Sequence, residues 1–537
     1  MDEKNGNSYK NRLYSIPSWK FGTMGQSSRL SNITTTVNPH LKSSDRYSLR
    51  NNPVVPLIDR IENRIASQGP YTVERGTMRV TISEVKREML GDLYLPNGSV
   101  VPELIGDTGK YAWGLYNPNY SNSYGYVKAR EAVQLYYREV YEMDIPINRI
   151  ILGEGVTGLM QPLGKLFMAS EGQETPKAGM GAIGYAPWPG TMIQYGFYPH
   201  FVQVDGKHQS LVNAEDIGTN VKFVLLYTVG NPGGMCLEEK HAESVINAIK
   251  EAMERQGKAI FLVIDDAYEA LMPKEKIINI HKLCEKYKVP YILMSGFDKA
   301  VSTGAHGGWM LIWMPPEMEK LTGDIDNAMA SIHGQYLGTN SVTQLQIMMY
   351  NLARLGMTSS QIDEWILKML PNAPTRSEHF DSRYAEYKKM GWLDKAETLE
   401  RDIAANLKNS WGWTNSVLEV FAGKERIVRL QGEKPDIPYY LFLRYGGDAS
   451  AQKLAVDIAE NTGIGVTPGD PFIAEEFAAK YGTCFRLAIV NDPVMAALDG
   501  SGRKVNFAEP LVDYLRFRIG ETETKRDRSL ASLDSVC

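Results

Sequence analysis

One lysine, Lys299, lies where a nucleophilic amine could do chemistry. It follows the short apolar run YILM (291–294) and precedes a glycine-rich turn, in the segment SGFDKAVSTGAHGGW (295–309). An amine that loses its water shell there can attack a carbonyl carbon. A lone lysine is ordinarily a solvated surface residue, so the assignment depends on other segments that lead to the same point.

Three further apolar runs end in chemically useful residues. RIIL leads into GEGVTGLM, KFVLLYTV into GNPGG, and AIFLVI into DDAYEA. They alternate with helical patterns such as EKHAESVINAIKEAMERQ, which predicts a largely parallel sheet with helices on both faces. Ligands bind such sheets at the carboxyl ends of the strands. We therefore expect one pocket that gathers Gly and Thr, Asn, Asp and Tyr, and Lys.

Composition excludes several classes of function. The 537 residues, 43% of them hydrophobic, can form one large and one smaller domain. A formal net charge of -5 gives no electrostatic footprint for nucleic acid or for an anionic membrane. Four widely spaced cysteines indicate neither a disulfide framework nor a metal site. No apolar run approaches the roughly 20 residues of a membrane helix, so we predict a soluble, cytoplasmic protein with a small-molecule substrate.

Changes in residue composition along the chain suggest where its domains begin and end. The first fifty residues are rich in Ser, Asn, Thr and Arg without periodicity, and the last ones are polar. We predict a flexible N-terminal arm (1–50) and a large domain made mainly of residues 51–355. A small C-terminal domain (356–525) with a helical insertion at about 356–435 and a disordered tail (526–537) would follow.

Two cofactors compete for the turn after the first of these strands. Gly153, Gly155 and Gly158 spell GxGxxG, which could hold a dinucleotide pyrophosphate. Such a site also needs an acidic residue at a second strand end about 20 positions on, but Glu171 and Glu174 lie in a polar loop. The same turn could instead cradle a single phosphate, and a nicotinamide-dependent oxidoreductase remains the alternative.

From about Tyr120 to about Arg486, the order of these motifs resembles the pyridoxal-phosphate-dependent aminotransferases of class I/II, fold type I. The resemblance implies an α/β fold with a mostly parallel seven-stranded sheet flanked by helices, and a smaller α/β C-terminal domain. It implies pyridoxal 5'-phosphate as cofactor and a homodimer with shared active sites. The turn GVTPGDPF would precede the strand that carries Arg486.

The resemblance assigns a role to each residue around the cofactor ring. Lys299 would form the Schiff base, and Asp265 would keep the pyridinium nitrogen protonated. Tyr268 and Asn231 would donate to the ring hydroxyl, and Trp188, in APWPG, would stack on the ring. Asn231 and Trp188 would also border the substrate.

Further assignments concern the phosphate and the substrate carboxylate. The usual phosphate-binding arginine is replaced by His306, which could equally be structural, and the serine expected three places before the lysine is Gly296. Arg486, in CFRLAIV, would fork onto the substrate carboxylate. The remaining cofactor-binding residues implied are Gly155, Val156, Thr157, Ser295, His306 and, from the partner subunit, Tyr120.

The resemblance favours transamination of an α-amino acid, with a 2-oxo acid as acceptor. Decarboxylation, β- or γ-elimination and oxidation stay open, because Asp265 and Lys299 would serve each of them. A non-catalytic regulatory protein on the same fold is disfavoured, since no basic DNA-binding segment is attached.

Overall fold

The computed structural model describes residues 124–167, 175–202, 214–300, 306–318, 341–369, 396–432, 434–462, 464–489 and 505–520, the single residues 325 and 339, and short strands at 72–73, 78–80 and 497–498. The predicted arm, the predicted tail and Tyr120 lie outside these ranges. The predicted domain boundaries therefore stay predictions.

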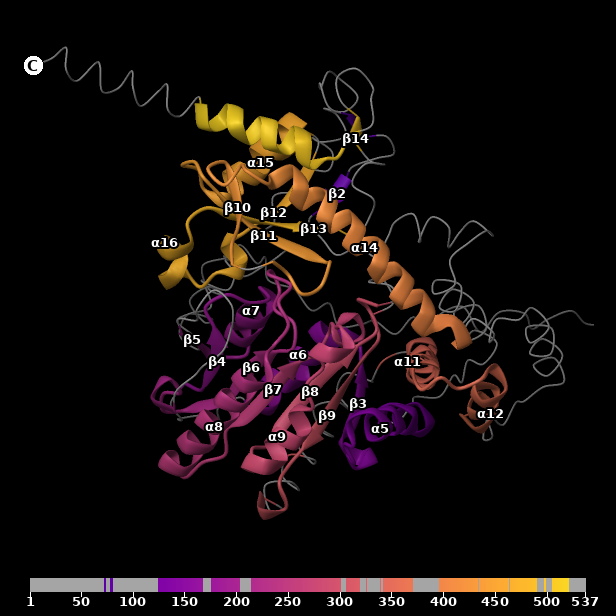
Figure 1. Ribbon diagram of the computed structural model, residues 1–537. Coiled ribbons are helices and arrows are strands. Elements are labelled where there is room, and N and C mark those ends of the chain that lie inside the picture. Colours follow the sequence, from indigo (N-terminus) through magenta and orange to yellow (C-terminus); the bar gives the residue numbers. More distant parts are fainter. Residues whose placement is uncertain are drawn as a thin grey trace, which may run out of the picture.

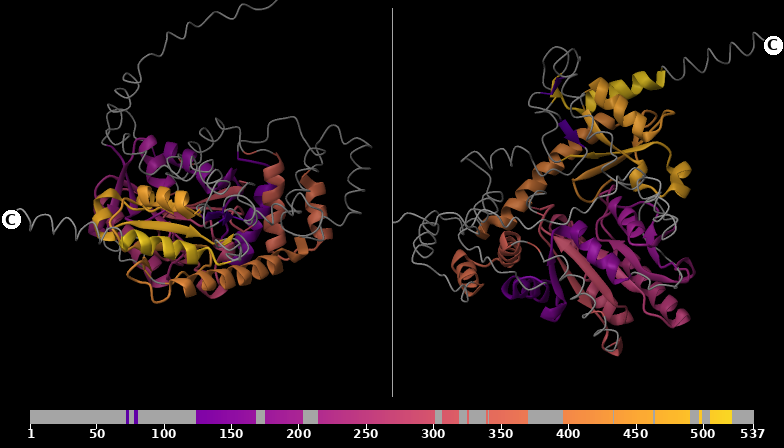
Figure 2. Two further views of the ribbon diagram at one scale, coloured as in Figure 1. Left: turned by 90° about the horizontal axis from the view of Figure 1, so that it is seen from above. Right: turned by 180° about the vertical axis from the view of Figure 1, so that it is seen from behind.

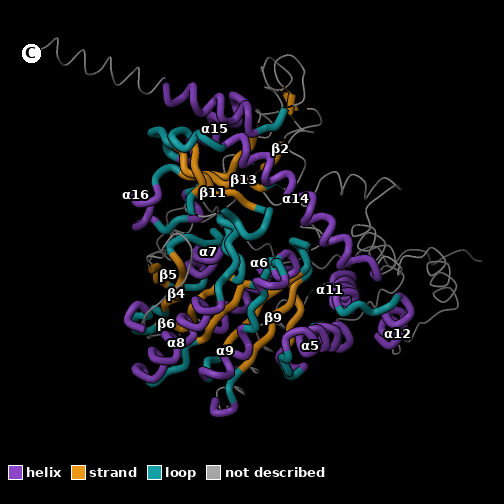
Figure 3. The backbone as a smooth tube through the Cα atoms, viewed as in Figure 1, coloured by secondary structure: helices purple, strands orange, loops and turns teal. Residues whose placement is uncertain are grey.

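A seven-stranded sheet forms the larger of two units (Figures 1 and 3). Its order is β3-β9-β8-β7-β6-β4-β5, and β9 alone runs antiparallel to its neighbours. The strands are β3 (Ile150–Gly153), β4 (Lys177–Gly181), β5 (Tyr198–Val202), β6 (Val221–Tyr227), β7 (Phe261–Asp265), β8 (Tyr291–Gly296) and β9 (Gly308–Trp313).

Alternate side chains of each central strand enter two separate cores. Along β7, Phe261 and Val263 enter one core while Leu262 and Ile264 enter the other, as the period of two requires. Helices α6 (Gly155–Leu166) and α7 (Pro187–Gln194) cover the first face. The opposite face carries α5 (Val127–Tyr141), α8 (Glu239–Gln256), α9 (Ile280–Tyr287), α11 (Ser341–Arg354) and α12 (Ser359–Met369). Burial on both faces explains why these strands are continuously apolar.

A smaller, mixed sheet has the order β10-β11-β13-β12-β2. Its strands are antiparallel except for β12 and β2, which run parallel. Helices α15 and α16 belong to this unit, as does a helix over residues 508–520. The bounds are β2 (Met78–Val80), β10 (Val428–Leu430), β11 (Tyr440–Tyr445), β12 (Ile464–Pro468), β13 (Cys484–Ala488), α15 (Ala451–Thr462) and α16 (Ala478–Tyr481), with a separate pair β1 (Thr72–Val73) and β14 (Ala497–Leu498).

One long helix, α14 (Leu399–Phe421), joins the two units (Figure 2). Leu399 and Ile403 belong to the core of the large unit, whereas Val417 and Phe421 belong to that of the small one. The predicted fold, a mostly parallel seven-stranded sheet with a smaller α/β unit, is confirmed.

Candidate functional site

The carboxyl ends of β6, β7 and β8 and the start of α6 surround one cavity. Its volume is about 480 Å³ when the space open to solvent is counted. It is lined by Val156, Thr157, Tyr185, Tyr227, Asn231, Asp265, Ala267, Tyr268, Gly296, Asp298 and Lys299. The structure thus brings together six residues predicted to act in one site.

Asp265, the last residue of β7, is a buried acid whose carboxylate accepts two hydrogen bonds. Its Oδ2 accepts a hydrogen bond from Trp188 Nε1 at 2.7 Å, and its Oδ1 accepts one from the Ala267 amide at 3.3 Å. Burial raises the pKa of Asp265, although both donors and the charge of Lys299 oppose this rise. A cation placed beside Asp265 would restore the ionised form.

Trp188 takes a different place from the one predicted. Its side chain is fully buried and is bonded to Asp265, and it is not among the residues that line the cavity. The cause is local: Pro187 and Pro189 flank it in the first turn of α7, and the indole turns into the core. Tyr185 is the aromatic residue of this turn that reaches the cavity. Tyr185 was not predicted as a site residue, because the only sequence signal for it is that it lies close to the same turn.

Four hydrogen-bonded polar side chains link the cavity to the small sheet. Asn231 Nδ2 donates to Tyr268 Oη at 3.2 Å, and Arg486 Nη1 donates to Asn231 Oδ1 at 2.8 Å. Tyr440 Oη lies 2.9 Å from Tyr268 Oη. The Arg486 guanidinium is stacked between Tyr440 and Phe472, 4.5 and 4.7 Å from their ring centres. Aromatic faces and a hydrogen bond stabilise this buried cation. The sequence did not single out Tyr440.

The other end of the cavity contains the predicted phosphate turn. Gly155 opens α6 at φ +66°, a conformation that favours glycine. Asp298 Oδ1 accepts the Gly307 amide at 2.9 Å, and Asp298 Oδ2 lies 3.8 Å from His306 Nδ1. The Asp298 carboxylate is an acceptor facing His306, and it raises the pKa of that imidazole. His306 itself is exposed and does not line the cavity.

Ser295 does not reach the cavity. It is buried in β8, and its hydroxyl donates to the carbonyl oxygen of Asp266 at 3.0 Å. The predicted cofactor contact is therefore replaced by a structural one, because one residue along a strand reverses the side-chain direction.

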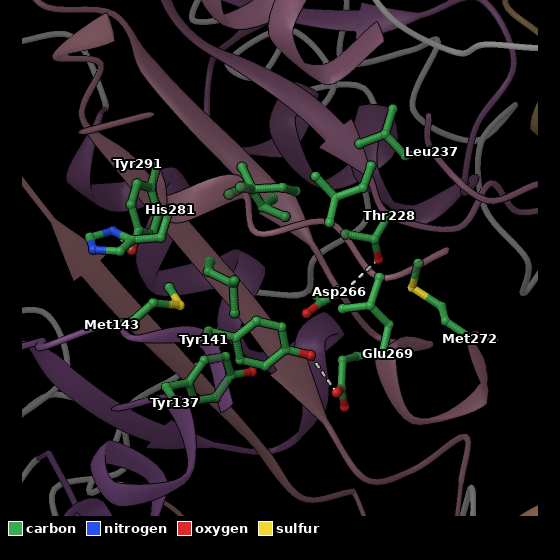
Figure 4. A pocket seen from close by; sticks show the side chains of 15 residues that line it. Tyr137, Tyr141, Met143, Thr228, Leu237, Asp266, Glu269, Met272, His281 and Tyr291 are labelled. Carbon is green, nitrogen blue, oxygen red and sulfur yellow. Dashed lines mark hydrogen bonds between the residues drawn. The ribbon is translucent and has the colours of Figure 1, made fainter. Parts of the chain in front are cut away.

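A second cavity lies on the opposite face of the sheet, between β7 and β8 and the helices α5 and α9; Figure 4 shows its lining side chains. Its volume, about 470 Å³ on the same measure, is close to that of the first, so size does not decide between them. Its polar groups already satisfy one another: Glu269 accepts from Tyr141 at 2.5 Å and from Arg354 at 3.0 Å, and Asp266 accepts from Thr228 at 2.5 Å. A satisfied network of this kind is structural.

Within the described part of the chain, no group of His, Cys, Asp and Glu could hold a metal ion. Among the described helices, none combines the length and apolar character needed to cross a membrane.

Residues 116–370 match the family model for aminotransferase class I and II. A comparison with curated proteins gives no match.

Solved structures share the fold at low identity. An Escherichia coli aminotransferase has a TM-score of 0.60 at 15% identity and covers 87% of this chain and 94% of its own. Alanine aminotransferase from Pyrococcus furiosus has a TM-score of 0.59 at 15% identity, covering 89% and 99%. Aspartate aminotransferase from Thermotoga maritima has a TM-score of 0.56 at 15% identity, covering 91% and 100%. Over residues 116–370 the chain belongs to aminotransferase class I and II, a family of pyridoxal-phosphate-dependent transferases.

Proposed function

We propose that the protein is an aminotransferase that uses pyridoxal 5'-phosphate and acts on an α-amino acid, with a 2-oxo acid as acceptor. The observation that supports this most is that Lys299 and Asp265 line the same cavity. Asp265 is buried there and its carboxylate accepts two hydrogen bonds. The donor set fits the ring of the cofactor: an amine, a carboxylate, and the hydroxyl and amide of Tyr268 and Asn231. When bound, the cofactor supplies an electron sink for the breaking of a bond to the substrate Cα.

The residues divide this work among them. Lys299 would hold the cofactor through its amine, and the same amine would move a proton at the substrate Cα. Asp265 would keep the ring nitrogen protonated, and the hydrogen bond from Trp188 holds the Asp265 carboxylate in place. Tyr268 and Asn231 would donate to the ring hydroxyl, and Tyr185, which lines the same cavity, would exclude water from it.

The substrate carboxylate would bind on the small-sheet side. Arg486 presents a planar fork next to Asn231, which suits a carboxylate. Homodimerisation, with the partner's Tyr120 completing the phosphate end, belongs to this proposal. So does a cytoplasmic location.

The test is covalent labelling of the purified full-length protein by pyridoxal 5'-phosphate. We expect a violet absorbance band and, after borohydride reduction, a mass increase on the peptide that contains Lys299. Lys299→Ala should lose both and keep its circular dichroism spectrum, whereas Lys288→Ala, a change at the opposite end of β8, should keep both. Labelling of Lys299→Ala as strong as in the wild type would overturn the proposal.

The reaction itself needs a product assay. An amino acid panel with pyruvate or 2-oxoglutarate should yield the paired amino acid. Release of carbon dioxide, ammonia or peroxide instead would assign the protein to decarboxylation, elimination or oxidation at the same site.

A further inference from the structure

A carboxylate already lies at the phosphate end of the cavity. Asp298 Oδ2 is so close to Gly155 that a Cβ atom at that glycine would be 2.7 Å from it. Asp298 Oδ1 accepts a hydrogen bond from the Gly307 amide at 2.9 Å. An acidic side chain of the chain itself therefore occupies space at the start of α6, where backbone donors and the helix dipole favour an anion.

The balance of charge at this end is also unusual for a phosphate site. Two acids, Asp298 and Glu154, face His306, and Lys299 is the other charged group that acts on it. Residues 300–316 contain no lysine or arginine. The cation that this loop can offer to a phosphate is the imidazolium of His306.

We propose that Asp298 and His306 make this site a weak discriminator between pyridoxal 5'-phosphate and phosphate-free pyridoxal. Phosphate is accepted best while His306 is protonated, because the imidazolium offsets the repulsion between Asp298 and the phosphate dianion. This inference rests on the proposed function and concerns the chemical form of its cofactor.

The dependence on pH follows from the groups around His306. Asp298, the largest influence, and Glu154 raise the pKa of His306, while partial burial and Lys299 lower it, and the rise prevails. The imidazolium therefore persists above the ordinary value of about 6.5. The preference for the phosphorylated form is present below that raised pKa and is lost as the pH rises through it.

The experiment measures dissociation constants of both aldehydes, by quenching of tryptophan fluorescence in the full-length protein, between about pH 7 and pH 9, where the phosphate is a dianion. The ratio of the two constants cancels the bond to Lys299, which both aldehydes form. Asp298→Asn should tighten pyridoxal 5'-phosphate about tenfold and leave pyridoxal within about twofold. His306→Asn should weaken the phosphorylated form at pH 7 and remove the pH dependence of the ratio. Asp513→Asn, which removes an exposed acid from the helix over 508–520, should change nothing.

The outcomes separate the two proposals. If pyridoxal 5'-phosphate labels Lys299 but the ratio is the same in Asp298→Asn and the wild type, this inference fails and the proposed function stands. If neither aldehyde attaches to Lys299, both fail. Should Asp298→Asn not fold, Asp298→Ser and His306→Asn carry the same comparison.

Discussion

Replacing Trp188 by phenylalanine removes the shortest hydrogen bond to Asp265 and keeps an aromatic ring in the core. The bond is 2.7 Å long and ends on a buried carboxylate. The Ala267 amide, at 3.3 Å, is then the remaining donor that contacts this side chain in the described residues. We expect the mutant to fold with a lower free energy of unfolding, and we expect the size of this decrease to depend on pH.

The magnitude follows from the charge on the acceptor. A buried hydrogen bond to a charged group contributes roughly 1.5–3 kcal/mol, and one to a neutral group about 1 kcal/mol. The smaller ring adds a cavity term of about 1 kcal/mol. Trp188→Phe should therefore cost about 2 kcal/mol when Asp265 is neutral and about 2.5–4 kcal/mol when it is ionised.

The sign of the pH dependence comes from the pKa of Asp265. Burial raises that pKa in the folded protein, so the protonated acid is the form that folding favours. Its contribution to stability is complete below the unfolded value of about 3.9 and is lost as the pH rises through the folded pKa. Trp188→Phe raises the folded pKa further, by roughly one unit per 1.4 kcal/mol, so the mutant loses stability over a wider range of pH.

The assay is urea unfolding of cofactor-free protein at several pH values from about 4.5 to 9. Trp309→Phe is the matched control, because Trp309 is also buried and its Nε1 donates to a neutral group, the Tyr137 hydroxyl, at 3.0 Å. Its cost should be about 2 kcal/mol at every pH. A loss for Trp188→Phe that is as flat with pH as the loss for Trp309→Phe would refute the claim that Trp188 supports an ionisable Asp265.

Three further predictions use the same contacts. Gly155→Ala should destabilise the protein by about 2 kcal/mol or more in urea unfolding, because alanine is strained at φ +66° and its Cβ would lie 2.7 Å from Asp298; an unchanged midpoint would contradict this. Arg486→Lys should lower kcat/KM for the amino acid by about a hundredfold, because the planar fork is lost, and leave the dissociation constant of the cofactor unchanged; equal losses in both would assign Arg486 to the cofactor. Glu269→Gln should cost roughly 3–5 kcal/mol of unfolding free energy, since it leaves the buried Arg354 without one partner of a salt bridge; a cost below about 1 kcal/mol would mean that Glu400 alone suffices.

The residues that could be predicted were those at strand ends. Lys299, Asp265 and Asn231 follow apolar runs that are buried on both faces, and the rule for parallel sheets brings such ends together. Those positions depend on backbone register, which the pattern of apolar residues specifies.

The errors concern the direction of a side chain. Trp188 and Tyr185 are three residues apart in one turn, and the sequence does not show which ring enters the cavity. Two prolines decide this by starting α7 around Trp188. The prediction for Ser295 failed for a similar reason. Neighbouring residues of a strand point to opposite faces, so Gly296 lines the cavity while the Ser295 hydroxyl donates to the Asp266 carbonyl oxygen.

The substrate side depends on contacts between segments that are far apart in the chain, which local patterns cannot show. Arg486 lies opposite Phe442 and Thr467 in the small sheet, yet its hydrogen bond is to Asn231, 255 residues away.

The loop after β6 is bound to the segment before β11 by further hydrogen bonds. The Asp436 amide donates to the Gly234 carbonyl at 2.9 Å, and the Cys236 amide donates to Asp436 Oδ2 at 2.9 Å. Gly234 has φ +72°, and a Cβ there would lie 3.3 Å from the Tyr440 carbonyl oxygen. The two sheets are therefore held together at the loop that carries Asn231. Asn231 is hydrogen-bonded to both Tyr268 and Arg486. A shift of the small sheet would therefore move Arg486 relative to the end of the cavity that Asp265 and Tyr268 line.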